Sequence, residues 1–186
     1  MEVPIVWSPG GTDVRAYDAT ASYNNAGIEM MEVRGGDSPY DTPNSSIDNP
    51  SGETDFDDDV GAGNGASPPV NVADLVVRLV GPATQSYDLT VTFNHIYDDA
   101  MQELPTGAPI VDTYLRGDIH ENGVVNIADA MMAAQYLAGN RALGELNAVN
   151  FACVRHDTGG DEMSIFDAMF ISQYLAELRD AYYNVP

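Results

Sequence analysis

The chain has 186 residues, 44% of them hydrophobic, which is enough to build one or two compact domains. It carries 29 acidic and 7 basic side chains, every basic one an arginine, for a formal net charge of −22. That balance argues against nucleic acids and anionic membranes as partners, and it favours divalent cations or a salty milieu. Cys153 is the single cysteine, so neither an intrachain disulfide nor a cysteine-based metal site is expected. No apolar run reaches the length of a membrane span, so membrane insertion is not expected either.

Residues 1–112 predict a β-domain of the sandwich type. Period-two alternation and runs of β-branched residues indicate four strands, and weaker signals add shorter ones. The stronger strands are expected over residues 14–23, 28–34, 73–80 and 87–93, and the shorter ones near 46–47, 54–56, 96–97 and 110–114. Several short strands separated by Gly, Pro and Asn turns are typical of an immunoglobulin-like sandwich.

Two polar features stand in the turn-rich segment between residues 35 and 71. Asn44 begins an N-glycosylation sequon, which is predicted to lie in a loop. An acidic run follows over residues 55–59, broken only by Phe56. Such a run is usually a solvated face, and a second cation site is the alternative interpretation.

Residues 118–129 have the form of a twelve-residue calcium loop. Gly123 occupies position six, where such a loop turns sharply with a positive φ. Side chains that carry oxygen or nitrogen stand at positions one, three, five, nine and twelve, namely Asp118, His120, Asn122, Asn126 and Asp129. An amphipathic helix is predicted directly after the loop, because apolar residues recur there at helical spacing.

This helix is repeated 38 residues later, counted from Asp129 to Asp167. Residues 165–176 echo residues 127–138, and each copy ends in Tyr-Leu-Ala. A duplicated loop-helix unit with Gly-Asp before the first loop and Asp at position twelve resembles a dockerin, over about residues 114–183. The resemblance implies a small all-α module that binds one calcium per intact loop and docks onto cohesin modules.

The resemblance also implies a ligand set for the first loop. Side-chain ligands would come from Asp118, Asn122, Asn126 and Asp129, and a backbone carbonyl from Val124. His120 departs from the Asn or Asp that the family has at position three. Because an imidazole nitrogen is a poor ligand for a hard cation, water is expected at that corner.

The second loop does not fit the pattern in either of two frames. Counting back from Asp167 places His156, Thr158, Gly160 and Asp161 at positions one, three, five and six. A frame shifted by one residue offers Asp157, Asp161 and Asp167 as ligands in a loop that is one residue short. The second loop is therefore either degenerate, with only the helix packing retained, or remodelled.

The β-domain is similar to a cohesin in the order of its segments. Residues 17–23 end in Ser-Tyr, a Glu-Met-Met-Glu-Val strand follows, and a later alternating strand precedes Asp98 and Asp99. Cohesins carry one or two further N-terminal strands, whereas only residues 1–11 precede the first strong strand here. We therefore expect an open sheet edge, and we expect residues 1–7 to serve as a donor strand for a neighbouring chain.

Taken together, the sequence predicts a multi-domain β + α protein. Residues 1–112 would form a cohesin-like sandwich and residues 113–186 a dockerin-like module, joined by a short Pro-rich junction. No set of side chains converges on a catalytic role, so the chain is not expected to be an enzyme. The predicted function is calcium-stabilised self-assembly, head to tail, outside the cell or at its surface. The alternative is docking onto a separate cohesin-bearing protein while the β-domain binds a glycan or surface. Residues 1–7 lack the features of a signal peptide, so the chain is either cytosolic or a mature form whose leader is missing, and the dockerin resemblance favours the mature form.

Overall fold

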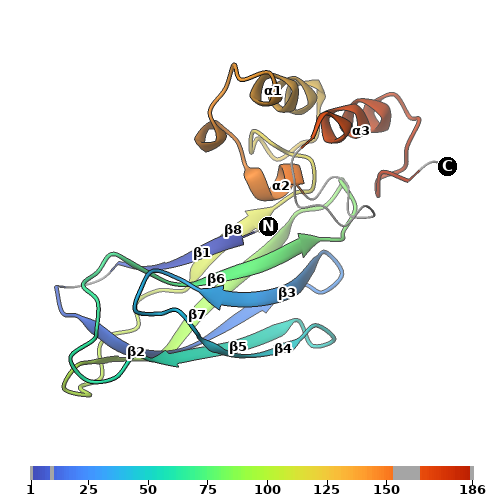
Figure 1. Ribbon diagram of the computed structural model, residues 1–186. Coiled ribbons are helices and arrows are strands. Elements are labelled where there is room, and N and C mark those ends of the chain that lie inside the picture. Colours follow the sequence, from blue (N-terminus) through green and yellow to red (C-terminus); the bar gives the residue numbers. More distant parts are fainter. Residues whose placement is uncertain (1, 9–10, 153–163, 185–186) are drawn as a thin grey trace.

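The computed structural model describes residues 2–8, 11–152 and 164–184 and shows a β-sandwich with short helices at one end (Figure 1). Within these ranges the strands are β1 (Glu2–Trp7), β2 (Val14–Tyr23), β3 (Ile28–Gly35), β4 (Asn44–Asp48), β5 (Glu53–Asp59), β6 (Val70–Leu79), β7 (Tyr87–Asp98) and β8 (Ile110–Tyr114). The helices are α1 (Ile127–Leu137), the 3-10 turn η1 (Leu143–Glu145), α2 (Ala148–Ala152) and α3 (Ile165–Leu175).

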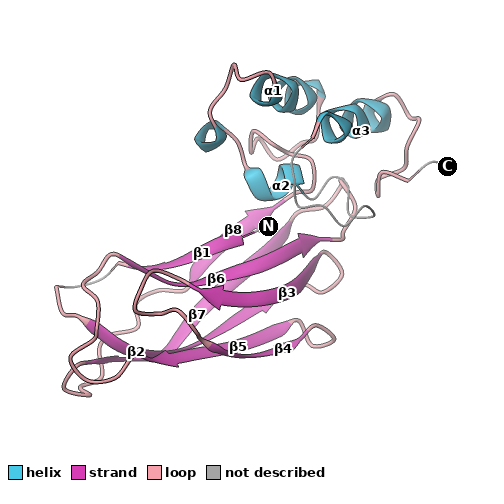
Figure 2. Ribbon diagram, in the orientation of Figure 1, coloured by secondary structure: helices cyan, strands magenta, loops and turns pink. Residues whose placement is uncertain are grey.

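The strands form two antiparallel sheets that enclose one apolar core (Figure 2). One sheet has the order β1-β6-β3, and the other has the order β4-β5-β2-β7-β8. Alternation in the sequence produces this burial: in β1, Val3, Ile5 and Trp7 are buried while the residues between them are exposed. Trp7 packs edge to face on Phe93 of the other sheet, with ring centroids 5.2 Å apart. Such aromatic contacts join the two layers.

The predicted strands are present, with two differences. β2 has the predicted bounds, residues 46–47 and 54–56 lie in β4 and β5, and residues 110–114 form β8. One strand, β7, contains both of the segments predicted separately at residues 87–93 and 96–97. Asn94, between them, is an extra residue at a register shift against β2. Asn44 is exposed but lies in the edge strand β4, so its prediction as a loop residue is wrong.

The prediction of a donated N-terminal strand is also wrong. Glu2–Trp7 pairs antiparallel with β6 of its own chain, from Glu2 opposite Val76 to Trp7 opposite Val70. Its inward side chains already fill the core of this sandwich, so the segment is not available to complete a neighbouring chain. β1 is nevertheless an edge strand, which is where Pro4, lacking an N–H, is tolerated.

The helical part is fastened to one end of the sandwich by backbone and side-chain contacts. β8 reaches Tyr114, two residues past the predicted boundary, and the first loop follows at once. The Ala83 N–H, between β6 and β7, donates to the Ala181 carbonyl over 2.7 Å. Within the helical part, which comprises the described residues after β8, the Tyr183 hydroxyl donates to the Arg116 carbonyl over 3.2 Å. Val149 of α2 belongs to the core of the sandwich. Among the described helices, none has the length and apolar character needed to cross a membrane.

Candidate metal centre

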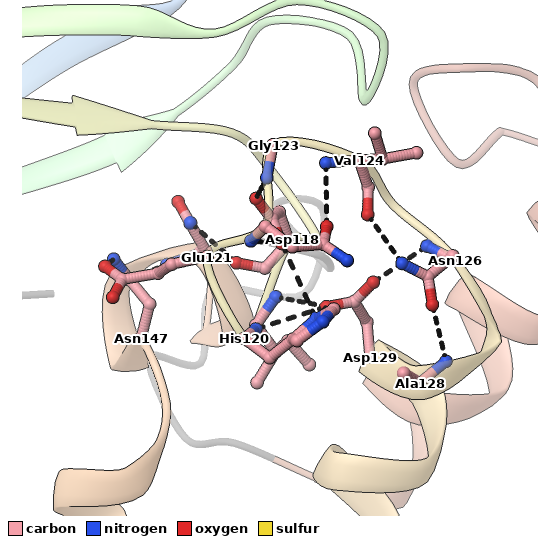
Figure 3. A network of polar contacts seen from close by, with 12 residues as sticks. Asp118, His120, Glu121, Gly123, Val124, Asn126, Ala128, Asp129 and Asn147 are labelled. Atoms are coloured by element: carbon pink, nitrogen blue, oxygen red, sulfur yellow. Dashed lines mark hydrogen bonds and ion pairs between the residues drawn. The ribbon is translucent and has the colours of Figure 1, made fainter.

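The first loop turns as its glycine predicts. Gly123 has a φ of +82°, a conformation that side chains with a Cβ rarely adopt. The turn brings two backbone N–H groups onto the Asp118 carboxylate, from Asn122 at 3.1 Å and from Gly123 at 2.7 Å (Figure 3). Asp118 is 3% exposed. Backbone N–H groups of the loop therefore stabilise the buried Asp118 carboxylate.

Asp129 ties the start of α1 to the start of the loop. One carboxylate oxygen accepts the N–H groups of Ile119 at 2.8 Å and His120 at 3.2 Å, and the other accepts the Asn126 N–H at 2.7 Å. Asn126 in turn caps the helix, because its side-chain oxygen accepts the Ala128 N–H at 2.8 Å. Asp129 is fully buried, so these donors stabilise a charge that would otherwise be costly.

His120 turns its ring into the loop, toward both carboxylates. Its Nδ1 lies 2.9 Å from an oxygen of Asp129 and 3.8 Å from an oxygen of Asp118. Ligand atoms of these three residues lie within 4.8 Å of one another, and no other group of three or more such side chains meets that spacing in the described part of the chain. The structure turns the imidazole toward the corner of the site where the sequence predicts water as the ligand.

The remaining predicted ligands of the first loop are joined by local hydrogen bonds. The Asn122 side chain accepts the Val124 N–H at 3.0 Å, and the Val124 carbonyl accepts from the Asn126 amide at 3.0 Å. Carbonyl and amide oxygens have two lone pairs, so each of these can also face a cation. Calcium takes six to eight oxygen ligands, and the carboxylates, amides and carbonyl of this loop fit it, while the His120 nitrogen does not.

Two asparagines that the sequence analysis did not single out hold the loop in place. Asn150 is 1% exposed, accepts the Leu115 N–H at 3.0 Å and donates to the Asp118 carbonyl at 2.8 Å. The Asn147 side-chain amide donates to the Glu121 carboxylate at 2.7 Å, and the Asn147 backbone N–H donates to the Ile119 carbonyl at 2.7 Å. They stand far from the loop in sequence and match no spacing rule, so only the fold reveals them.

The second copy keeps the helix end of the pattern. Asp167 is 1% exposed and accepts from the Ser164 N–H at 2.7 Å and the Ser164 hydroxyl at 2.9 Å, as Asp129 accepts from Asn126 in the first copy. The two helices also end alike: Arg141 donates to Gln135 at 2.7 Å, and Arg179 donates to Gln173 at 2.6 Å. The other predicted positions of the second loop, His156, Asp157, Thr158, Gly160 and Asp161, lie outside the described residues.

The acidic run of residues 55–59 is strand β5 and not a loop. Asp55 accepts from the Thr20 hydroxyl at 2.8 Å, and Asp59 pairs with Arg15 at 2.9 Å. Phe56 points into the core between them. Within the described ranges these carboxylates do not gather around a common point, which favours the interpretation as a solvated sheet face.

The sequence matches no protein-family model, and no curated protein matches it. Several solved structures are similar to the chain, and they contain cohesin modules. A non-cellulosomal cohesin from the hyperthermophilic archaeon Archaeoglobus fulgidus has 19% identity and a TM-score of 0.48, covering 61% of this chain and 77% of that one. A cohesin–dockerin complex from Clostridium thermocellum has 14% identity and a TM-score of 0.47, covering 61% and 85%. The sixth cohesin of scaffoldin B from Acetivibrio cellulolyticus, in complex with a Cel5 dockerin, has 13% identity and a TM-score of 0.48, covering 60% and 85%.

These structures contain cohesins, the family to which the order of segments in residues 1–112 is similar. At these identities and TM-scores the likeness leaves function to be argued from the residues of this chain.

Proposed function

We propose that this chain is a non-enzymatic protein–protein assembly module whose helical part is stabilised by calcium. The supporting observation is that the duplicated helices expose the same apolar side chains. Ile127 and Ile165 are 61% and 58% exposed, and Met131 and Met169 are 55% and 40% exposed. α1 and α3 contact each other, and each helix presents its pair to solvent (Figure 1).

The core of the helical part does not account for these exposed pairs. The buried apolar positions of the two helices are Ala130 and Ala133 of α1 and Ala168 and Ile171 of α3. Isoleucine and methionine on the outer positions add nothing to that core, and they place apolar area in contact with water. Exposed apolar patches of this kind mark surfaces that bind other proteins, and methionine suits such surfaces because it adapts its shape.

Calcium would order the loop that carries Asp118 and Asp129. Two buried carboxylates repel each other, and a divalent ion between them converts that repulsion into attraction. Extracellular calcium modules bind with dissociation constants on the order of 10⁻⁴–10⁻³ M. We therefore place the protein outside the cell or at its surface, where such an ion is a structural component.

The proposed partner is a second copy of the chain, bound head to tail. A helical surface on one end and a sandwich on the other give two different surfaces, and a contact between unlike surfaces closes into rings or continues as filaments. The second candidate is a separate cohesin-bearing protein, with the sandwich free to bind a glycan or another surface. The net charge of −22 favours this second candidate, because copies repel each other unless cations screen them.

Light scattering on the purified chain, with millimolar calcium and then with chelator, tests the proposal. Self-assembly predicts particles larger than a monomer that dissociate on chelation and in the double variant Met131→Glu with Met169→Glu. Met31→Glu, which changes a 49%-exposed methionine of β3, is the matched control and should assemble normally. A monomer under all conditions contradicts self-assembly. Binding to an immobilised cohesin module, lost in the double variant and kept in the control, would then support the separate partner.

A further inference from the structure

The His120 triad gathers one imidazole nitrogen and two carboxylate groups whose ligand atoms lie within 4.8 Å of one another. The His120 Nδ1 lies 2.9 Å from Asp129, which is the length of the hydrogen bond between the two side chains, and 3.8 Å from Asp118. Adjacent ligands at ~2.1 Å from a tetrahedral zinc ion are ~3.4 Å apart, and ligands at ~2.3–2.6 Å from calcium, at a right angle, are ~3.3–3.7 Å apart. The spacing therefore suits either ion, and the chemistry of the ligands decides between them.

The chemistry of the three ligands favours a transition-metal ion. Imidazole suits zinc and other first-row transition metals, and a set of one nitrogen and two carboxylate oxygens is a mixed set that these ions accept. The His120 Nδ1 is hydrogen-bonded to Asp129, and the roles of donor and acceptor depend on the tautomer of the ring. The tautomer that carries its proton on Nε2 has a lone pair on Nδ1 that can bind a metal ion.

The carboxylates are already oriented for this role. Asp118 and Asp129 are held by backbone N–H groups of the loop, and their side chains are 4% and 0% exposed. The His120 side chain is 27% exposed, so the site meets solvent on the imidazole side. An incoming ion can complete its coordination there with water. Supporting hydrogen bonds of this type fix ligand direction and raise metal affinity.

We infer that Asp118, His120 and Asp129 make the first loop a site for a first-row transition-metal ion such as Zn²⁺ or Co²⁺, in competition with calcium. This inference rests on the proposed function, because it concerns the same loop. It assigns His120 the role of selecting the metal: imidazole at position three adds affinity for transition metals and removes an oxygen that calcium would use.

Calorimetry and the visible spectrum of bound Co²⁺ test the inference on the full chain. Wild type should bind Co²⁺ with ligand-field bands of a mixed nitrogen–oxygen site, and Zn²⁺ should displace it. His120→Asp should lose at least about tenfold in Co²⁺ affinity and gain in calcium affinity, because a hard anionic oxygen replaces a nitrogen. His95→Ala is the matched control, since His95 forms an exposed pair with Glu103 at 2.8 Å and should change neither ion. His156→Gln removes the remaining imidazole and should leave the response of His120→Asp unchanged.

The outcomes separate this inference from the proposed function. Calcium binding with unchanged Co²⁺ affinity in His120→Asp overturns the inference and leaves the calcium role standing. Co²⁺ binding that depends on His120, without calcium binding in any variant, supports the inference and overturns the calcium role. His120→Asn guards against misfolding: a parallel loss of both ions in His120→Asp and His120→Asn overturns the assignment of selectivity to His120.

Discussion

The sandwich and the helical part differ in what they bury. Among the described residues, the buried polar or charged side chains are Thr54, Arg116, Asp118, Asp129, Asn150 and Asp167. Only Thr54 belongs to the sandwich, whose core is otherwise aliphatic and aromatic. Apolar burial contributes about 25 cal/mol per Å² and needs no partner, whereas a buried charge costs several kcal/mol unless it is paired. The sandwich is therefore stabilised by apolar burial, whereas the stability of the helical part depends on hydrogen bonds or ions that compensate its buried charges.

The largest effect should come from Asp129→Ala. The substitution leaves the buried N–H groups of Ile119 and Asn126 without their acceptor and removes a predicted ligand. We expect a loss of ~3–5 kcal/mol from the helical part and no calcium uptake at the first loop. Calorimetry measures the uptake, and Asp57→Ala, which removes an exposed carboxylate from β5, is the control for net charge. Unchanged uptake in Asp129→Ala contradicts the ligand assignment.

Removal of calcium should have the next largest effect, and on one region only. At several hundred-fold excess over Kd, a bound ion stabilises the folded state by ~3–4 kcal/mol. Trp7 is the single tryptophan and is buried in the sandwich, whereas α1, α2 and α3 lie in the helical part. Tryptophan fluorescence and helical ellipticity therefore report on the two regions separately during thermal unfolding. Chelator should lower the midpoint of the ellipticity more than that of the fluorescence, and equal shifts would remove the contrast between the regions.

Asn150→Ala should sharpen the comparison at the boundary between the regions. Asn150 links Leu115, directly after β8, to the backbone of Asp118, so its loss leaves two buried backbone groups unpaired. We expect Asn150→Ala to lower the free energy of unfolding by ~2–3 kcal/mol and to weaken calcium binding. Asn150→Asp should recover part of the lost stability, because its carboxylate can still accept the Leu115 N–H. The control is Asn25→Ala, because the exposed Asn25 side chain donates to the Pro50 carbonyl of the sandwich at 2.8 Å, away from the loop. Equal calcium affinity in Asn150→Ala and wild type would show that Asn150 is structural without positioning the loop.

The sequence predicted the elements better than it predicted their partners. Alternation located β2 with its bounds, because one face of that strand is buried and the other is not. The register shift at Asn94 hid the continuity of β7, because it places two consecutive residues at the surface. The pairing of β1 with β6 joins residues about seventy positions apart, which no local pattern encodes. The orientation of the His120 ring likewise depends on how the loop packs, although the sequence shows that His120 occupies position three of the loop.

The smallest predicted effect concerns two neighbouring carboxyls of β5, the half-buried Asp58 and the exposed Asp59. Burial, together with nearby carboxylates, raises the pKa of Asp58 above its usual value. The hydrogen-bonded Arg15 guanidinium, together with the Gly61 N–H, lowers the pKa of Asp59. The signs are opposite. A raised pKa means that Asp58 costs stability once the pH rises through it, and a lowered pKa means that Asp59 contributes stability that is lost as the pH falls through it.

Asp58→Asn should therefore stabilise the sandwich slightly at neutral pH, and Asp59→Asn should destabilise it slightly. Both differences from wild type should disappear in strong acid, below the two pKa values, where all three proteins carry neutral groups at these positions. Denaturant unfolding followed by Trp7 fluorescence, at neutral pH and in acid, measures the four differences. Calcium should alter none of them, because these carboxyls belong to β5 and not to the loop of the helical part. If Asp58→Asn and Asp59→Asn shift stability in the same direction at neutral pH, the opposite pKa directions are wrong. If chelator changes either difference, the two regions are electrostatically coupled and the contrast between them fails.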